Sequence, residues 1–509
     1  MAAPVTARRV MGTEIEYGIA VPGLPHMNSM VLSAQIVGAY AGGERSMEGG
    51  TRWDFEEEHP LRDARGIELP PALQETLEGV YEDPGLLNAV LTNGARLYVD
   101  HAHPEYSTPE VTHPLAAVLH ERAGELIMLS ALRRTNAVPG TPQVNLYKNN
   151  TDNKGASYGA HENYLVDRSV PFASLVRHMT PFFVTRQIFA GAGRVGRGQE
   201  GRGLGFQLSQ RADFMEAEVG LETTVKRPII NTRDEPHADP AMHRRFHVIV
   251  GDANMSQLAS FLKLGTTSLV LGAIEAGGLD GLPEIADPVR EIQEVSHDHL
   301  LQHRIRLSDG RRMTALEIQD YYLEAITAAI EAGGLDSSDG GAEQVVHEWG
   351  RVLNILGDDP LSLAGELDWP AKLNLLEGYR RRGNLDWDDP KLALIDLQYH
   401  DIRPEKGLYH TLVTSGRMRT LVTDEQAEEA VLRPPEDTRA WFRGECLRRF
   451  ADSIFAASWD SIVFDIAGRD ALQRIATSDP LKGTKQHVGA VLDRSKDAAA
   501  LVDALQPES

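Results

Sequence analysis

Between residues 93 and 110 the chain reads Asn93-Gly94-Ala95-Arg96-Leu97-Tyr98-Val99-Asp100-His101-Ala102-His103-Pro104-Glu105-Tyr106-Ser107-Thr108-Pro109-Glu110. The Asn-Gly pair marks a turn. The alternation after it predicts a short strand with Arg96, Tyr98 and Asp100 on one face, followed by a polar loop that carries Glu105. Hard oxygen ligands and one carboxylate at a strand end suit Mg²⁺ and phosphate chemistry. A solvated edge strand followed by a loop would contain the same residue types.

A second acidic strand near the N-terminus favours the metal interpretation. Residues 11 to 19 read Met11-Gly12-Thr13-Glu14-Ile15-Glu16-Tyr17-Gly18-Ile19, and their alternation places Glu14 and Glu16 on one face. Two carboxylates two residues apart repel each other unless a cation lies between them, and a bivalent metal is the simplest such cation. A solvent-exposed strand face is the alternative.

The bulk composition limits the class of protein. The chain has 509 residues, 42% of them hydrophobic, so it can form a large core and two or three domains. Cys446 is the only cysteine, which excludes an intramolecular disulfide framework and fits a reducing compartment. We see no signal-peptide pattern and no apolar run of membrane-spanning length, so we expect a soluble, cytoplasmic protein without a membrane partner. The formal net charge of −23 disfavours binding to nucleic acid.

Composition also changes along the chain. Residues 41–66 are first rich in glycine and then acidic and aromatic, and we interpret them as a loop that covers a site, with Trp53 and Phe55 docking on it. A solvated loop is the plainer alternative. Consecutive prolines at 434 and 435 mark a boundary, so we predict a domain over 1–429 and a small domain over 430–509.

Apolar periodicity predicts a largely helical centre. Asn254 or Ser256 can cap one of these helices. A G-x-G-x-x-G pattern at 191–196 follows a helix and opens none, so we reject a dinucleotide site there and interpret it as an arginine-bearing loop. The predicted helices cover 30–40, 114–135, 172–189, 257–276, 315–332, 343–356, 370–382, 390–400, 437–450 and 494–505.

Further strands deliver polar groups of a similar kind. His161 and Asn163 share a strand face, and His247 lies on another strand. Arg211 and Arg233 lie in or at the end of extended stretches, where an arginine can clamp a phosphate, although either alone could be a surface residue. Acidic groups for Mg²⁺ together with arginines for phosphate indicate an enzyme that uses ATP.

Four segments carry a resemblance to a known family. Gly12 through Gly18, Asn93 through Glu110, Arg211-Ala212-Asp213-Phe214 and His247 through Ser256 closely resemble the Dop family, the deamidases and depupylases of the prokaryotic ubiquitin-like protein Pup. The resemblance spans nearly the whole chain. It implies an α+β fold related to glutamine synthetase and the carboxylate–amine ligases, with a large antiparallel sheet flanked by helices and a small C-terminal α/β domain. The related Pup ligases look similar around the metal strands, and the insertion at 41–66 favours Dop.

The resemblance also implies residue roles. Asp100 would be the central catalytic carboxylate, and ATP and Mg²⁺ would be the cofactors. The expected metal ligands are Glu14, Tyr98, Glu105, His161 and His247. The residues expected at the nucleotide are Gly12, Thr13, Glu16, Arg96, Ser107, Thr108, Asn163, Arg211, Arg233 and Trp459, of which Trp459 could instead be a core residue.

The implied reaction removes ammonia from a C-terminal Gln of Pup or cleaves the isopeptide bond between Pup and a lysine. The partners would be Pup and pupylated proteins, with an indirect link to the bacterial proteasome. Because Pup is acidic in this family, we expect a local basic groove, with Arg194, Arg197 and Arg202 as candidates. A Pup–protein ligase and a nucleotide-bound module that binds Pup without turnover remain alternatives. The sequence names no acid for the leaving amine.

Overall fold

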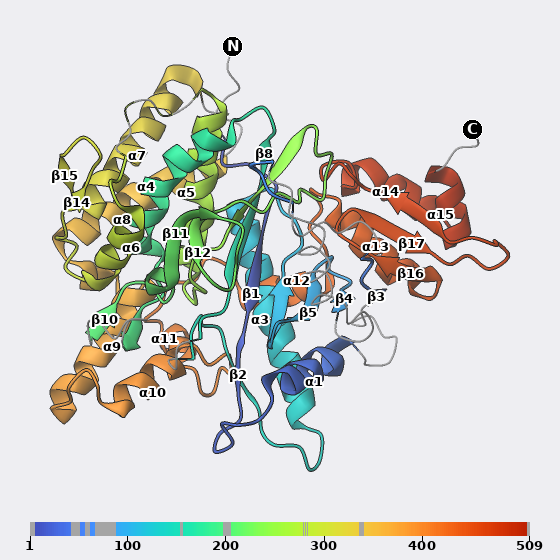
Figure 1. Cartoon of the computed structure of the whole chain (residues 1–509). Coiled ribbons are helices and arrows are strands. Elements are labelled where there is room, and N and C mark those ends of the chain that lie inside the picture. Colours follow the sequence, from blue (N-terminus) through green and yellow to red (C-terminus); the bar gives the residue numbers. More distant parts are fainter. Residues whose placement is uncertain are drawn as a thin grey trace.

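A seven-stranded antiparallel sheet forms the centre of the molecule (Figure 1). The computed structural model describes residues 6–41, 51–55, 62–66, 88–152, 156–196, 205–277, 279, 281, 284–334 and 340–505. In spatial order the strands are β13 (His243–Val248), β8 (Ala160–Asp167), β1 (Met11–Glu16), β6 (His103–Ser107), β5 (Arg96–Asp100), β4 (Asn88–Val90) and β3 (Thr51–Arg52). The α+β class and the large antiparallel sheet expected from the sequence are therefore confirmed.

Two helices cover one face of this sheet. The helices α1 (Ser29–Ala41) and α3 (Pro114–Asn136) pack on β1, β5 and β6, and bury Ile15, Tyr17 and Leu97 with them. A Cβ atom at Gly124 would lie 2.3 Å from the Tyr106 ring, so α3 approaches the sheet this closely only with glycine there. Because side chains alternate along a strand, the residues between these apolar ones must point to the opposite face.

A helical layer packs beside the sheet. Its helices are α4 (Phe172–Ala190), α5 (Gln257–Glu275), α6 (Pro288–His297), α7 (Ala315–Ala329), α8 (Gly340–Asp358), α9 (Asp368–Gly383), α10 (Pro390–Tyr399) and α11 (Leu408–Thr414). The helix α12 (Asp424–Leu432) packs on α3 instead. By length and composition α5 could cross a membrane, but all of its apolar window is buried, as in a core helix. The Ser256 hydroxyl accepts from the Ala259 N–H at 3.1 Å, which confirms the predicted cap.

Short strand pairs connect the layers. They are β2 (Gly18–Ala20) with β7 (Asn145–Tyr147), β9 (Arg194–Gly196) with β10 (Gly205–Gln207), β11 (Met215–Gly220) with β12 (Arg227–Asn231), and β14 (Ile305–Arg306) with β15 (Arg312–Met313). After β10 the chain turns into a 3₁₀ segment, Ala212–Phe214, because the Ser209 hydroxyl accepts from the N–H groups of Arg211 and Ala212. The sequence predicts an extended stretch at Arg211, but β10 ends at Gln207 and Arg211 leads into the 3₁₀ segment.

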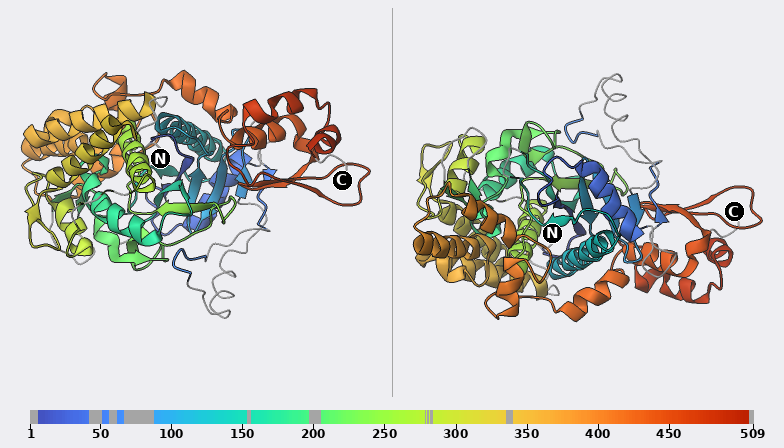
Figure 2. Two further views of the ribbon diagram at one scale, coloured as in Figure 1. Left: turned by 90° about the horizontal axis from the view of Figure 1, so that it is seen from above. Right: turned by 90° about the horizontal axis from the view of Figure 1, so that it is seen from below.

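The C-terminal region has a core cluster of its own and lies to one side of the molecule (Figure 2). Trp53 and Val90 from the sheet edge join this cluster. Glu110, whose side chain is 14% exposed, pairs with Arg439 and Arg443 and so attaches the region to the loop that follows β6. The elements are α13 (Ala440–Phe450), β16 (Ile454–Ala457), β17 (Ser461–Phe464), β18 (Gln473–Ala476), α14 (Lys485–Arg494) and α15 (Ala498–Leu505). The domain boundary at residue 430 stays a prediction.

Candidate functional site

The face of the sheet opposite α1 and α3 collects polar side chains from five neighbouring strands. In the strand register Glu14 lies opposite both Ser107 and His161, and Glu105 lies opposite both Glu16 and Tyr98. The alternation predicted for β1 and β5 is thus confirmed. The side chains on this face are Arg245 and His247 from β13, His161 and Asn163 from β8, Glu14 and Glu16 from β1, Glu105 and Ser107 from β6, and Arg96, Tyr98 and Asp100 from β5.

Three carboxylates form the first possible cation site. Ligand atoms of Glu16, Asp100 and Glu105 all lie within 4.8 Å of one another. Burial, and then the charges of Asp100 and Glu16, raise the pKa of Glu105 well above its ordinary value. The Tyr98 hydroxyl donates to Glu105 Oε1 at 2.5 Å. Because three acidic groups this close repel one another, the residues fit a bivalent cation bound by oxygen atoms.

A second possible cation site adjoins the first. Ligand atoms of Glu14, His161 and His247 also lie within 4.8 Å of one another. Asn163 Nδ2 donates to Glu14 Oε1 at 2.8 Å, and His247 Nδ1 lies 2.9 Å from Asn163 Oδ1. Burial and the nearby Arg245 lower the pKa of His247, so its ring is neutral. Its buried Nε2 has no hydrogen-bond partner in the described part of the chain. An unpaired nitrogen of a neutral imidazole ring can bind a metal ion.

The backbone fixes Glu16 in place. Burial raises the pKa of Glu16, but His103, His161 and the Gly159 N–H outweigh it, and the net shift is downward. The Gly159 N–H donates to Glu16 Oε1 at 2.8 Å. A Cβ atom at position 159 would lie 2.6 Å from that oxygen and from His161 Nε2. A side chain at position 159 would therefore displace Glu16 or His161.

Asp100 lies at the turn between β5 and β6. His101 follows it with a positive φ of 53°, and His101 Nδ1 lies 2.6 Å from Asp100 Oδ2. The carboxylate raises the pKa of His101. The Asp100 side chain is 26% exposed against 9% for Glu16, so Asp100 is the more accessible of these two carboxylates.

The predicted arginines lie near the acidic groups. The buried Arg211 donates through Nε to the Ile249 carbonyl at 3.1 Å, while its Nη2 has no partner among the described residues. Burial and the neighbouring Arg227 lower the pKa of Arg211 to about 10. The charge of Arg233 acts on His101 and His247. The two arginines therefore approach the acidic groups from outside the sheet and could meet phosphate there.

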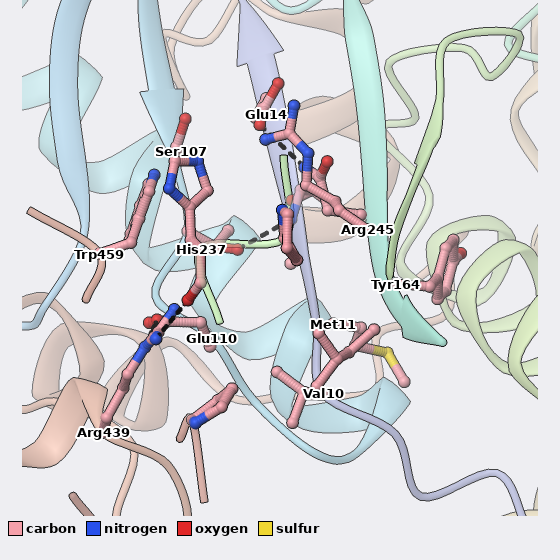
Figure 3. A pocket seen from close by; sticks show the side chains of 17 residues that line it. Val10, Met11, Glu14, Ser107, Glu110, Tyr164, His237, Arg245, Arg439 and Trp459 are labelled. Atoms are coloured by element: carbon pink, nitrogen blue, oxygen red, sulfur yellow. Dashed lines mark hydrogen bonds and ion pairs between the residues drawn. The ribbon is translucent and has the colours of Figure 1, made fainter. Parts of the chain in front are cut away.

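A cavity of about 80 Å³ continues the site toward the C-terminal region (Figure 3). Trp459, His237 and Arg245 line it together with Glu14, and Arg439 lies at its far end (Figure 3). Rings, apolar side chains and a few polar groups in one cavity suit a planar, partly apolar ligand. Of the predicted nucleotide residues, the cavity lining contains Gly12, Thr13, Ser107, Thr108, Asn163 and Trp459.

Not every predicted side chain points into this cavity. Thr13 alternates with Glu14, so its hydroxyl lies on the covered face, while its N–H donates to Thr108 Oγ1 at 2.9 Å. The Arg96 guanidinium stacks 3.8 Å from the Trp53 ring, and Trp53 meets Trp459 edge-on at 5.3 Å. Arg96 therefore supports the aromatic wall from behind.

The structure describes only some of the residues for which the sequence predicts a loop over a site and a basic groove. Trp53 is buried in the C-terminal cluster and Phe55 packs on it, so both aromatic residues are docked here. The segments 42–50 and 56–61 of the expected loop lie outside the described residues, as do Arg197 and Arg202. Arg194 is 4% exposed over the Phe214 ring, so it does not line an exposed basic groove as expected.

Sequence patterns missed several residues of the site. Arg245 could have been found, because it alternates with His247 on β13. Gly159 and His103 give no local signal, since their roles depend on the strand pairing around Glu16. His237 and Arg439 enter the cavity from distant segments.

Comparison with known proteins gives consistent matches. The family model for Pup-ligase proteins matches residues 9–463. The chain is 58% identical to a depupylase from Acidothermus cellulolyticus, over 98% of this chain and 99% of the relative. It is 52% identical, over the same shares, to a Pup deamidase/depupylase from Mycolicibacterium smegmatis. A Pup–protein ligase from Paenarthrobacter aurescens is 42% identical, over 80% of this chain and 90% of the relative.

Solved structures of Pup ligases have the same fold. The ligase PafA in complex with Pup superposes with a TM-score of 0.78 at 34% identity, covering 96% of this chain and 91% of that one. PafA in complex with ADP gives a TM-score of 0.72 at 36% identity, covering 86% of this chain and 96% of that one.

Proposed function

This chain belongs to the Pup-ligase family, and we propose that it is a Pup deamidase and depupylase that requires ATP and Mg²⁺. The observation that carries the proposal is the placement of Asp100 beside Glu16 and Glu105, next to the cavity that contains Trp459. The higher identity to the depupylases than to the ligase supports hydrolysis over ligation. The substrates would be Pup with a C-terminal Gln and Pup joined to a lysine side chain.

Asp100 would carry the chemistry. Its carboxylate either attacks the amide carbonyl or takes the proton from an attacking water. In sum one water is consumed, the C–N bond breaks, and ammonia or the lysine amine leaves while Pup keeps a C-terminal Glu. Arg211 and Arg233 would stabilise phosphate or oxyanion charge near the acidic cluster.

Magnesium fits the oxygen-rich part of the site. Glu14, Tyr98 and Glu105 would hold it, with His161 and His247 as additional ligands that suit Mg²⁺ less well than oxygen atoms do. When bound, the metal supplies positive charge to phosphate oxygens and to the carboxylates. Burial and the charge of Asp100 raise the pKa of Glu105, so a bound cation would favour its ionised form.

The nucleotide would lie along the same face. We propose that Trp459 contacts the base, and that Gly12, Ser107 and Asn163 lie along the rest of the nucleotide. A solved structure of a Pup ligase, PafA, is a complex with ADP, which supports nucleotide binding by this chain. We also propose a cytoplasmic location, an indirect link to the proteasome, and a separate domain from residue 430.

A mass-spectrometric assay tests the function. The full chain is incubated with ATP and Mg²⁺ and, separately, with Pup ending in Gln and with a Pup–protein conjugate. We expect release of ammonia and of free protein, both abolished by chelation. Asp100→Asn should reduce either rate at least 10³-fold, whereas Asp309→Asn, in an exposed turn, should not change it.

Ligation is the second candidate, because ligases share this fold and this family. New conjugates formed from Pup ending in Glu, without cleavage of existing ones, would establish it in place of hydrolysis. If Pup binds but neither reaction occurs, the chain is a binding module.

A further inference from the structure

Asp252 is a buried carboxylate that the proposed reaction does not use. It lies in the loop after β13 and is 2% exposed. Its Oδ1 accepts from the Ser209 hydroxyl at 2.8 Å, and its Oδ2 accepts from the N–H groups of Ala192 at 2.8 Å and of Gln210 at 2.9 Å. The Lys263 ammonium donates to the backbone carbonyl of Asp252 instead. Within the described part of the chain, neutral donors therefore satisfy this carboxylate, and they do so only in this arrangement.

These hydrogen bonds fix the turn that carries Arg211. The Ser209 hydroxyl accepts from the N–H groups of Arg211 at 3.0 Å and of Ala212 at 3.1 Å. Both of its lone pairs are therefore used, and its proton goes to Asp252. An asparagine at position 252 would place an NH₂ group against either the Ser209 hydroxyl or the two N–H donors. The carboxylate is thus the group that holds the whole turn.

The Arg211 guanidinium in turn holds a peptide unit of the site. Its Nε donates to the Ile249 carbonyl at 3.1 Å, and its Nη1 donates to the Tyr158 carbonyl. That carbonyl belongs to the peptide unit whose N–H, on Gly159, donates to Glu16 Oε1 at 2.8 Å. Because a peptide unit is planar, a donor that fixes its carbonyl also fixes the direction of its N–H.

We propose that Asp252 is a positioning residue for Glu16 and acts on it through Arg211. The hydrogen bonds run without a gap from Asp252 through the turn to the guanidinium, and from there through one peptide unit to the Glu16 carboxylate. The inference rests on the proposed cation and nucleotide site at Glu16. It does not depend on whether the chain hydrolyses or ligates Pup.

The position of Glu16 matters because its carboxylate shares a cluster with Asp100 and Glu105, whose ligand atoms lie within 4.8 Å of one another. A displaced Glu16 would change the spacing that a cation meets there. Asn150 Nδ2 also donates to the Tyr158 carbonyl, at 3.0 Å. Loss of the Asp252 carboxylate should therefore shift Glu16 and not release it, so we expect a moderate effect.

Titration of the full chain with Mn²⁺, followed by electron paramagnetic resonance of the free ion, tests the inference. Mn²⁺ is the probe because it takes the same oxygen ligands as Mg²⁺. Asp252→Asn should weaken Mn²⁺ binding about three- to tenfold, less than the roughly 10- to 100-fold typical of a group that bonds a ligand directly. Asp368→Asn is the matched control. Asp368 is also a buried carboxylate with three neutral donors (Asn254, Ser256 and Tyr399) but lies outside both cation sites, so its change should leave Mn²⁺ affinity unaltered.

A double-mutant cycle separates positioning from a general loss of stability. Arg211→Met keeps an extended side chain but removes both guanidinium bonds, so Asp252→Asn should cause no further loss of Mn²⁺ affinity in that chain. An equal loss with and without Arg211 would overturn the inference, because Asp252 would then act on the fold as a whole. If Asp252→Asn does not fold, Ser209→Ala, which removes only the hydroxyl, takes its place in the same cycle.

Two further outcomes would also overturn the inference. They are Mn²⁺ binding unchanged by Asp252→Asn, and an equal weakening by Asp368→Asn. If the unchanged chain does not bind Mn²⁺, the proposed cation site fails and the inference fails with it. A chain that binds Mn²⁺ but leaves Pup conjugates intact would contradict the proposed hydrolysis alone, and the affinities of the variants would still decide the role of Asp252.

Discussion

Tyr98 and Glu105 face each other across β5 and β6, and the Tyr98 hydroxyl donates to Glu105 Oε1 at 2.5 Å. The bond holds one of three crowded carboxylates in a fixed orientation. Tyr98→Phe should therefore weaken Mg²⁺ binding about 10- to 100-fold, the usual effect of removing a group that orients or binds a metal ligand. The Mg²⁺ dependence of the deamidation rate measures this. Tyr147→Phe, outside the site, is the control, and an equal effect of both changes would refute the role of Tyr98.

Substitution of Trp459 tests whether ATP binds in the cavity that Trp459 lines. Replacing it with alanine removes an aromatic wall and should raise the dissociation constant of ATP about two- to tenfold. Trp459→Phe keeps a ring and should bind nearly as the unchanged chain does. Fluorescence titration with a labelled ATP analogue gives the constants. If Trp459→Ala binds nucleotide normally, the base lies elsewhere.

Substitution of Gly159 tests whether activity depends on the position of the Glu16 carboxylate. Alanine there would place a methyl group 2.6 Å from Glu16 Oε1, so the carboxylate must move. Because displacements of about 1 Å in a catalytic site cost about 100-fold in rate, we expect a loss of that size in deamidation. The control is Gly205→Ala, which meets nothing within 4 Å. A fully active Gly159→Ala chain would show that Glu16 need not hold this position.

The lowered pKa of Glu110 predicts that the stability of the folded chain depends on pH. Burial raises its pKa, but Arg443 and Arg439 outweigh this and hold the pKa at about 2 against an ordinary value of 4.5. The lowered pKa stabilises the folded chain by roughly 3 kcal/mol above pH 4.5, and this contribution disappears as the pH falls toward 2.

Urea unfolding at several pH values measures that contribution. Glu110→Gln should be much less stable than the unchanged chain at pH 6, and the difference should shrink below about pH 4.5. Glu429→Gln, in an exposed pair with Arg433, should show neither effect. A stability difference that stays constant from pH 6 to pH 3 would contradict the assignment.

The central strands were predictable because their signal is local. Alternation alone placed Glu14 and Glu16 on one face, and the pairing with β6 and β8 then brought Glu105 and His161 to them. The long helices followed from periodicity in the same way, and the cap at Ser256 from residue type.

The parts that depend on distant contacts were not predictable. Arg439 reaches the cavity only because Glu110 pairs with α13 across more than 300 positions of sequence. Lys148 pairs with Glu121 and Glu125 of α3 although it follows β7, and no spacing rule connects these residues. Arg194 is a residue for which the prediction was wrong. A charged residue in a glycine-rich segment suggests an exposed side chain, but Arg194 is buried over the Phe214 ring.

The alternation of β1 has a consequence for folding fidelity. If β1 paired one position out of register, Ile15 and Tyr17 would face the polar side, and Glu14 and Glu16 would enter the apolar layer under α1 and α3. An unpaired carboxylate there would cost several kcal/mol, so the mispaired chain could not compete with the correct one. Glu14 and Glu16, assigned to metal and nucleotide binding, thus also disfavour the wrong strand alignment. A chain that lacks both acids would lose this protection against mispairing as well as its activity.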